Sequence, residues 1–330
     1  MSSNDNLGNL TSDVAKATGL PAVAKGKVRR WLLKLVGGTL GAEIVEEARR
    51  NLDTTAGRSR VNALLAEEVA RRAISDPDIM DRATARFLSD EFRKQENREA
   101  IAKATIEELG GSDPEPDSGS PIPDDTATTE QEEDWLNTFS RFAEDASSER
   151  MQRLWARVLA GEIRKPCSFS PSTLRFVSEL DQQTAEAFKR LAPYVLHDFV
   201  VWDEEWRTGE KFTLALELEN AGILAGSAGT FHRKYSGLGD RTGIVARDDR
   251  YGLAGAAPNH VEVTVQALLL TKVGKELLPL VGPIDIRPGL RKLADLLREG
   301  GFVEIWLGDV VRSPSGPLVR HGELLWRAPN

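Results

Sequence analysis

The sequence predicts an α+β protein with an all-helical N-terminal region, an acidic linker, and a C-terminal region in which helices are followed by strands. Three observations support this prediction. Apolar residues recur at helical spacing over the first 110 residues, a Pro- and Asp-rich stretch covers 111–129, and runs of β-branched residues begin near residue 199. The chain has 330 residues, 40% of them hydrophobic, which is enough for about two domains.

The N-terminal region carries four predicted helices. Apolar spacing favours helices over 21–36, 40–52 and 57–75, and the first of these ends at a pair of glycines. The breaker Asp76-Pro77-Asp78 then precedes a helix over 78–109 that no Pro or Gly interrupts. The middle of this long helix is strongly polar, so we expect it to be exposed or to pair with another subunit.

The stretch 111–129 separates two regions of nearly balanced charge. The net charge is -8, and residues 111–146 hold 11 acidic residues against one basic residue. Because Pro, Gly, Ser and Asp dominate 111–129, it cannot bury enough surface to offset the entropy of ordering it. We therefore expect a helical region over 1–110, a disordered acidic linker over 111–129, and a second domain over 130–330.

The second domain is predicted to begin with helices and end with strands. Ser170 with Pro171 and Asp181 are typical N-terminal caps, the second for a helix through about Leu196, and Thr271 caps a later helix. The predicted helices are 131–145, 148–163, 171–180, 181–196, 212–221, 271–280 and 288–298. The predicted strands are 199–202, 229–236, 243–253, 260–270, 302–307 and 318–326.

A helical motif carries the first resemblance to a known family. The run Leu154-Trp-Ala-Arg-Val-Leu-Ala-Gly-Glu-Ile163, followed by Ser168-Phe-Ser-Pro-Ser-Thr-Leu174, resembles an uncharacterised bacterial family of unknown function over about 130–310. The apolar members of the motif have core spacing, so we expect it to be structural. Its distinctive residues are Trp155, Arg157, Gly161 and Glu162.

A second resemblance is to the abortive-infection alpha family of phage-defence proteins. It is carried by the motif helix and by Leu180-Asp-Gln-Gln-Thr-Ala185, in which Thr184 stands where that family prefers Asp. This resemblance implies a role in anti-phage defence. Neither family supplies a catalytic residue to carry over.

A third resemblance is to winged-helix modules. Leu216-Glu-Leu-Glu-Asn-Ala-Gly-Ile-Leu224 looks like the end of their third helix, and Leu270-Thr-Lys-Val-Gly-Lys-Glu-Leu277 looks like the element after their wing. About 45 residues lie between these runs, which implies an elaborated wing. We expect a protein-interaction platform or a simple scaffold, with nucleic-acid binding through the wing as the alternative. The basic residues for that alternative are Arg233, Lys234, Arg241, Arg247 and Arg250.

The basic helix 21–36 leaves two hypotheses open. It packs its apolar side chains on neighbouring helices, or it lies on an anionic membrane with Trp31 at the interface. The membrane-facing residues would be Lys27, Arg29, Arg30, Trp31 and Lys34. Homo-oligomerisation through the N-terminal helices is a further expectation.

Nothing in the sequence assembles a familiar catalytic or metal site. The four histidines, at 197, 232, 260 and 321, are scattered, and Cys167 is the single cysteine. Phosphate-loop, nucleophile-elbow and zinc motifs are missing. We therefore predict no catalytic residue, metal or cofactor. The expected function is that of a cytoplasmic, non-enzymatic interaction or regulatory protein, and the resemblance above adds anti-phage defence as its setting.

Overall fold

The computed structural model describes the chain in segments that form two compact units. The units are Met1–Ser178 and Glu179–Asn330, and each is described by itself. The predicted helices over 40–52 and 57–75 and the predicted linker 111–129 lie outside the described residues. The described residues are Val28, Trp31, Leu32, Leu35, 77–110, 130–229, 231–237, 239–313, 316–320 and 322–329.

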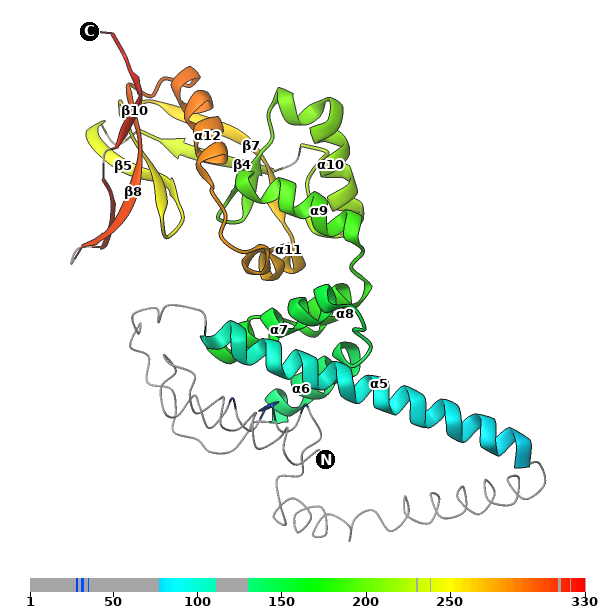
Figure 1. Ribbon diagram of the computed structural model, residues 1–330. Coiled ribbons are helices and arrows are strands. Elements are labelled where there is room, and N and C mark those ends of the chain that lie inside the picture. Colours follow the sequence, from blue (N-terminus) through cyan, green and yellow to red (C-terminus); the bar gives the residue numbers. More distant parts are fainter. Residues whose placement is uncertain are drawn as a thin grey trace. The chain divides into compact units, whose positions relative to one another are not determined.

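The described secondary structure of the first unit consists of helices joined by short loops (Figure 1). Helix α5 packs along α7, and α6 lies against α5. These contacts join the helices on the two sides of 111–129 into one unit. The compact units therefore divide after Ser178, whereas the sequence analysis placed the domain boundary at 111–129. The helices are α5 (Pro77–Gly110), α6 (Glu130–Ala143), α7 (Glu149–Arg164) and α8 (Pro171–Glu179).

A row of aromatic rings forms the centre of the first unit. Trp31 stacks on Trp135 with ring centroids 5.6 Å apart, and Trp135 stacks on Phe139 at 5.3 Å. Phe139 in turn meets the edge of Trp155 at 5.2 Å. All four side chains are buried, and such aromatic pairs stabilise a core beyond the area they bury. Trp31 is thus packed on α6.

The second unit combines helices with two antiparallel sheets, which confirms the α+β class. Its helices are α9 (Gln182–Leu191), α10 (Gly209–Asn220), α11 (Lys272–Leu277) and α12 (Arg287–Glu299), with short 3₁₀ turns η2 (Ala192–Tyr194), η3 (Glu204–Arg207) and η4 (Leu278–Val281). Its strands are β1 (Val195–Leu196), β2 (Phe199–Val201), β3 (Leu224–Ala225), β4 (Phe231–Ser236), β5 (Gly239–Arg247), β6 (Tyr251–Ala257), β7 (Glu262–Leu270), β8 (Glu304–Ser313), β9 (Gly316–Val319) and β10 (Glu323–Arg327).

Both sheets contain parts of one long, bent hairpin. Strands β4 and β5 follow each other and pair with β7 and β6, respectively. The proximal half of this ribbon joins β1, β2 and β3, and its distal half joins β8, β9 and β10. The bend lies at Gly237, where a Cβ would collide with the carbonyl oxygen of Pro258. Helix α12 packs on both halves, so one hydrophobic core spans the two sheets (Figure 1).

Three predicted elements end differently in the structure. The helix that Asp181 caps ends at Leu191, because the chain tightens into a 3₁₀ turn at Pro193 and then forms β1. The predicted strand 243–253 is two strands joined by a turn, in which an Asp248 carboxylate oxygen accepts hydrogen bonds from the amides of Arg250 and Tyr251. The predicted strand 318–326 is divided between β9 and β10.

Candidate functional site

The motif residues of α7 serve the local structure of the first unit. Glu162 is 4% exposed, and its carboxylate accepts hydrogen bonds from the amides of Cys167 at 2.6 Å and Phe169 at 3.0 Å. A Cβ on Gly161 would lie 2.8 Å from the Phe169 ring. Trp155 belongs to the buried aromatic row, whereas Arg157 pairs with Glu108 at 3.8 Å on the surface. The motif thus holds the loop that follows α7.

The predicted membrane residues divide into one buried ring and four basic side chains. Trp31 is 2% exposed and lies against Trp135, so it does not present its ring to a membrane surface. The side chains of Lys27, Arg29, Arg30 and Lys34 lie outside the described residues. Within the described segments, no helix has the length and hydropathy to cross a bilayer.

Most described basic residues of the wing already have acidic partners within the fold. Arg233 forms an ion pair with Asp198, and the Asp198 carboxylate also lies 3.1 Å from the ammonium nitrogen of Lys275. Lys234 pairs with Glu262 at 2.7 Å. Arg250 lies over the ring of Tyr251. The side chain of Arg241 lies outside the described residues.

Helix α10, the candidate recognition helix, presents acidic groups. Glu210 is 94% exposed, and Glu217 also faces solvent. The one basic residue of the helix, Lys211, is held by Glu205 and lies over the rings of Tyr194 and Trp206. A phosphate backbone would therefore meet negative charge along this helix.

The structure brings Arg233, Lys234 and Arg247 to two neighbouring cavities, of about 600 Å³ and 240 Å³. His197 and Arg247 line both and form their common wall. The larger cavity is also lined by Asp248, Asp249 and Gly282 and by the apolar residues Val195, Leu278, Pro279, Ile284 and Ile286, and the smaller one is lined by 196–199, 233–235 and 245–247. We call the two cavities together the mouth groove.

His197 occupies a strained backbone position at this common wall. Its φ is 63°, and the amide of Asp198 donates to the carbonyl of Leu196 at 2.8 Å. This pattern is that of a classic γ-turn, which is rare and strained for a residue with a side chain. The imidazole is exposed, and no other residue in the described part of the chain forms a hydrogen bond with it.

Arg247 and Tyr235 complete the polar side of the mouth groove. The Arg247 guanidinium donates to the Asp248 carbonyl at 3.2 Å and lies 3.9 Å from the carboxylate of Asp249, which is 93% exposed. Burial raises the pKa of Tyr235 to about 12, despite the opposing charge of Arg233. Among the residues that the structure describes, no three His, Cys, Asp or Glu side chains are placed to hold a metal ion.

His197 and Asp198 were not among the site residues expected from the sequence. The predicted helix continued through Leu196, so the hairpin at 197–198 was missed. The available signal was a polar His-Asp pair between two short apolar runs, Val195-Leu196 and Phe199–Trp202, which is typical of a tight turn between strands.

Comparison with known proteins gives one match. Residues 81–199 match a family described as "Protein of unknown function (DUF2806)". Over this stretch the chain is similar to an uncharacterised family. The match covers just over a third of the chain, starts earlier and ends earlier than the expected 130–310, and ends at the first residue of β2. Neither the curated proteins nor the solved structures contain a match.

Proposed function

We propose that this chain is a non-enzymatic interaction protein whose C-terminal unit offers a winged-helix-like platform to other proteins. The order of elements supports the winged-helix part of the proposal. Helix α9, strand β2, turn η3 and helix α10 precede a hairpin whose returning strand, β7, pairs with β2. The bent β4–β7 ribbon then corresponds to the elaborated wing.

We favour a protein partner over nucleic acid because basic side chains of the proposed wing are already paired within the fold. Arg233 and Lys234 are paired with carboxylates, and the distal half of the wing is part of a second sheet. Binding of nucleic acid depends on basic side chains that can exchange counterions for phosphates. This wing has few such groups, and the exposed carboxylates of α10 would oppose a phosphate backbone.

A mobility-shift experiment with duplex DNA at low salt tests this choice. The full chain is expected to leave DNA mobility unchanged, and one defined host protein is expected to be captured reproducibly by the immobilised chain. Retarded DNA that returns to normal mobility with Arg247→Glu would reverse the choice in favour of the DNA-binding alternative. Arg247 is the residue that most favours that alternative, because its one ion pair is with the highly exposed Asp249.

Anti-phage defence is the biological setting that we propose for this interaction. Its support is the resemblance of the motif helix and of 180–185 to abortive-infection proteins. Phage should form more plaques on host cells that lack the chain than on cells that carry it. Because the chain is expected to be cytoplasmic, the comparison is made with intact cells. Capture of the same partner with and without phage challenge would show whether infection changes the interaction.

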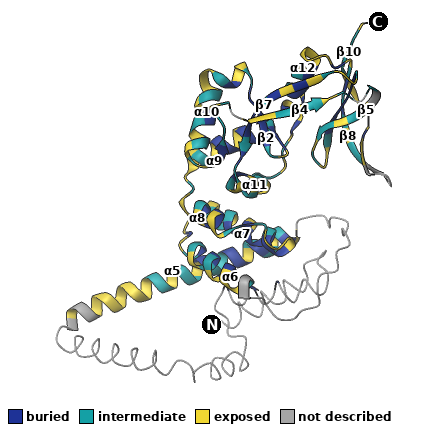
Figure 2. Ribbon diagram, turned by 180° about the vertical axis from the view of Figure 1, so that it is seen from behind, coloured by how far each residue is buried: buried dark blue, intermediate teal, exposed yellow. Residues whose placement is uncertain are grey.

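Self-association through the N-terminal helices is a second proposed interaction. Residues 81–89 of α5 are exposed, and Phe87, Leu88 and Phe92 are exposed large apolar side chains of this helix (Figure 2). Exposed large apolar side chains in one stretch are typical of interaction surfaces. Light scattering of the full chain should show an oligomer that Phe92→Ser weakens and that the matched surface change Arg86→Ser leaves intact. A wild-type monomer at high concentration would remove this proposal.

A further inference from the structure

We propose that the mouth groove is the docking site for an extended segment of a partner protein that carries a carboxylate beside a large apolar side chain. This inference rests on the proposed function, because it names where and how the partner is held. Three observations support it: the two cavities, the weakly paired positive charge of Arg247, and the strained turn at His197.

The larger cavity suits a large apolar side chain. Its volume is about 600 Å³, and Leu278, Pro279 and Ile284 form one side of it. Ile286 lines the cavity and also belongs to the hydrophobic core, so the apolar wall is backed by packed structure. Binding sites are typically apolar hollows with a few polar groups at defined places, which is the arrangement here.

Arg247 supplies the attraction for a carboxylate. Several other charged groups of the groove have closer internal partners, since Asp198 binds both Arg233 and Lys275, Lys234 pairs with Glu262, and a carboxylate oxygen of Asp248 accepts two backbone amides. The Arg247 guanidinium is oriented by the Asp248 carbonyl at 3.2 Å, while its ion pair with Asp249 is long and solvent-exposed. An arriving carboxylate can therefore replace Asp249 and form a two-pronged hydrogen-bonded pair.

The division of the groove favours an extended chain as its occupant. His197 and Arg247 line both cavities, so one occupant can place side chains on either side of them. In an extended peptide, alternate side chains lie about 7 Å apart on the same side. Val245 and Ala246 of β5 line the smaller cavity, and β5 is the last strand of its sheet, so its outer backbone groups can bind an added strand.

The γ-turn at His197 fits a binding role better than a structural one. A glycine would adopt a φ of 63° without strain, and the imidazole forms no hydrogen bond within the described fold. The strained turn places an aromatic donor and acceptor on the wall that both cavities share. Positions of this kind occur preferentially where a ligand is held.

Selection from a displayed library of random heptapeptides on the immobilised full chain tests the inference. We expect enrichment of sequences with Asp or Glu next to Leu, Ile, Phe or Met. A synthetic peptide of the enriched sequence should then bind in fluorescence anisotropy, and replacing its acid by the matching amide should weaken binding at least tenfold. Arg247→Gln should have a similar effect.

Arg250→Gln is the matched control, because Arg250 lies on the same hairpin and lines neither cavity. It should change peptide affinity less than twofold. Thermal unfolding of both variants checks that each folds, and Arg247→Lys should keep part of the affinity.

Several results would overturn the inference. They are the absence of enrichment, an affinity that Arg247→Gln leaves unchanged, and equal competition by hexanoate, which would assign the groove to small carboxylates. If the chain still captures its host protein in any of these cases, the proposed function stands and only the groove is wrongly assigned. If neither a peptide nor a host protein binds, both proposals fail.

Discussion

The two units use their most distinctive residues in opposite ways. In the first unit, the motif residues Trp155, Gly161 and Glu162 all make contacts within the helical core or its adjoining loop. In the second unit, the mouth groove is built from separate segments, and no recognisable motif marks it. A sequence signature in this protein therefore marks a local structural requirement, whereas the candidate binding surface depends on residues that are distant in the sequence.

The largest loss of stability is expected for Glu162→Ala. Removing the carboxylate leaves the buried amide of Phe169 and the partly buried amide of Cys167 without their acceptor, so the free energy of unfolding should fall by about 3 kcal/mol. Urea unfolding measures the change. Glu149→Ala, which removes an exposed ion pair and one acidic charge in the first turn of α7, should cost about 1 kcal/mol or less. Equal losses in the two variants would show that Glu162 is not a structural anchor.

Gly237→Ala tests whether the close backbone approach at Gly237 stabilises the second unit. Its Cβ would collide with the backbone of Pro258 at the bend of the ribbon, so the free energy of unfolding should fall by about 2 kcal/mol. Gly110→Ala is a suitable control, because nothing lies within 4 Å of its added Cβ. Thermal unfolding of both variants makes the comparison, and a neutral Gly237→Ala would mean that the bend does not depend on this close approach.

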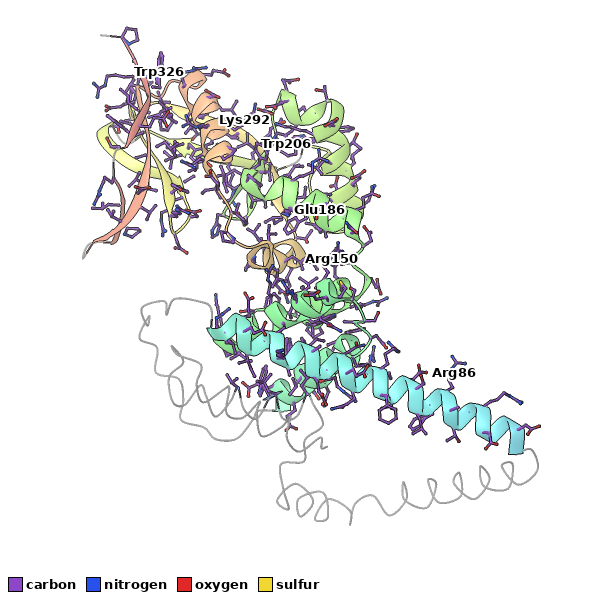
Figure 3. The ribbon with its side chains drawn as sticks, viewed as in Figure 1. Arg86, Arg150, Glu186, Trp206, Lys292 and Trp326 are labelled. Atoms are coloured by element: carbon purple, nitrogen blue, oxygen red, sulfur yellow. The ribbon has the colours of Figure 1, made fainter. Side chains whose placement is uncertain are left out.

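Glu205 should make the stability of the second unit depend on pH in the acid range. Hydrogen bonds from Lys211 and Lys292 lower the pKa of Glu205 to about 2, and Lys292 reaches it from α12 (Figure 3). Because the folded-state pKa is lowered, this stabilisation is present above the ordinary pKa near 4.5 and is lost as the pH falls toward 2. Since Glu205 is half exposed, we expect about 1 kcal/mol after solvent screening.

The variant Glu205→Gln should therefore lower the free energy of unfolding at pH 7 and match the wild type near pH 2. Urea unfolding across this range measures the difference. Glu204→Gln should be nearly silent, because its ion pair with Arg207 is highly exposed. A Glu205→Gln deficit that persists at pH 2 would assign the effect to packing instead of charge.

His197→Gly should have an effect of about the same size as Glu205→Gln, with the opposite sign. Relief of the positive φ should raise the free energy of unfolding by about 1 kcal/mol. His197→Asn, which tolerates the left-handed region, should give a smaller gain. Calorimetry measures both, and a destabilised glycine variant would mean that the imidazole contributes to the fold. His197 would then contribute to the stability of the fold and not to binding alone.

Local signals in the sequence predicted much of the fold. Asp181 and Thr271 cap their helices as expected, with bonds to the amides of Thr184 at 2.7 Å and Gly274 at 3.2 Å. These features involve residues three apart, so the sequence shows both partners at once. The turn at 197–198 was missed because a short apolar run gives the same pattern in a helix and in a strand.

The sequence by itself determined the α+β class, most helix boundaries, and the apolar spacing of the motif helix, because each depends on neighbouring residues. Only the tertiary structure decided that α5 and α7 form one unit, that the distal half of the β4–β7 ribbon joins a second sheet against α12, and that His197 and Arg247 line the same cavities. These features depend on pairing across long stretches of chain, and many different pairings satisfy the same local pattern.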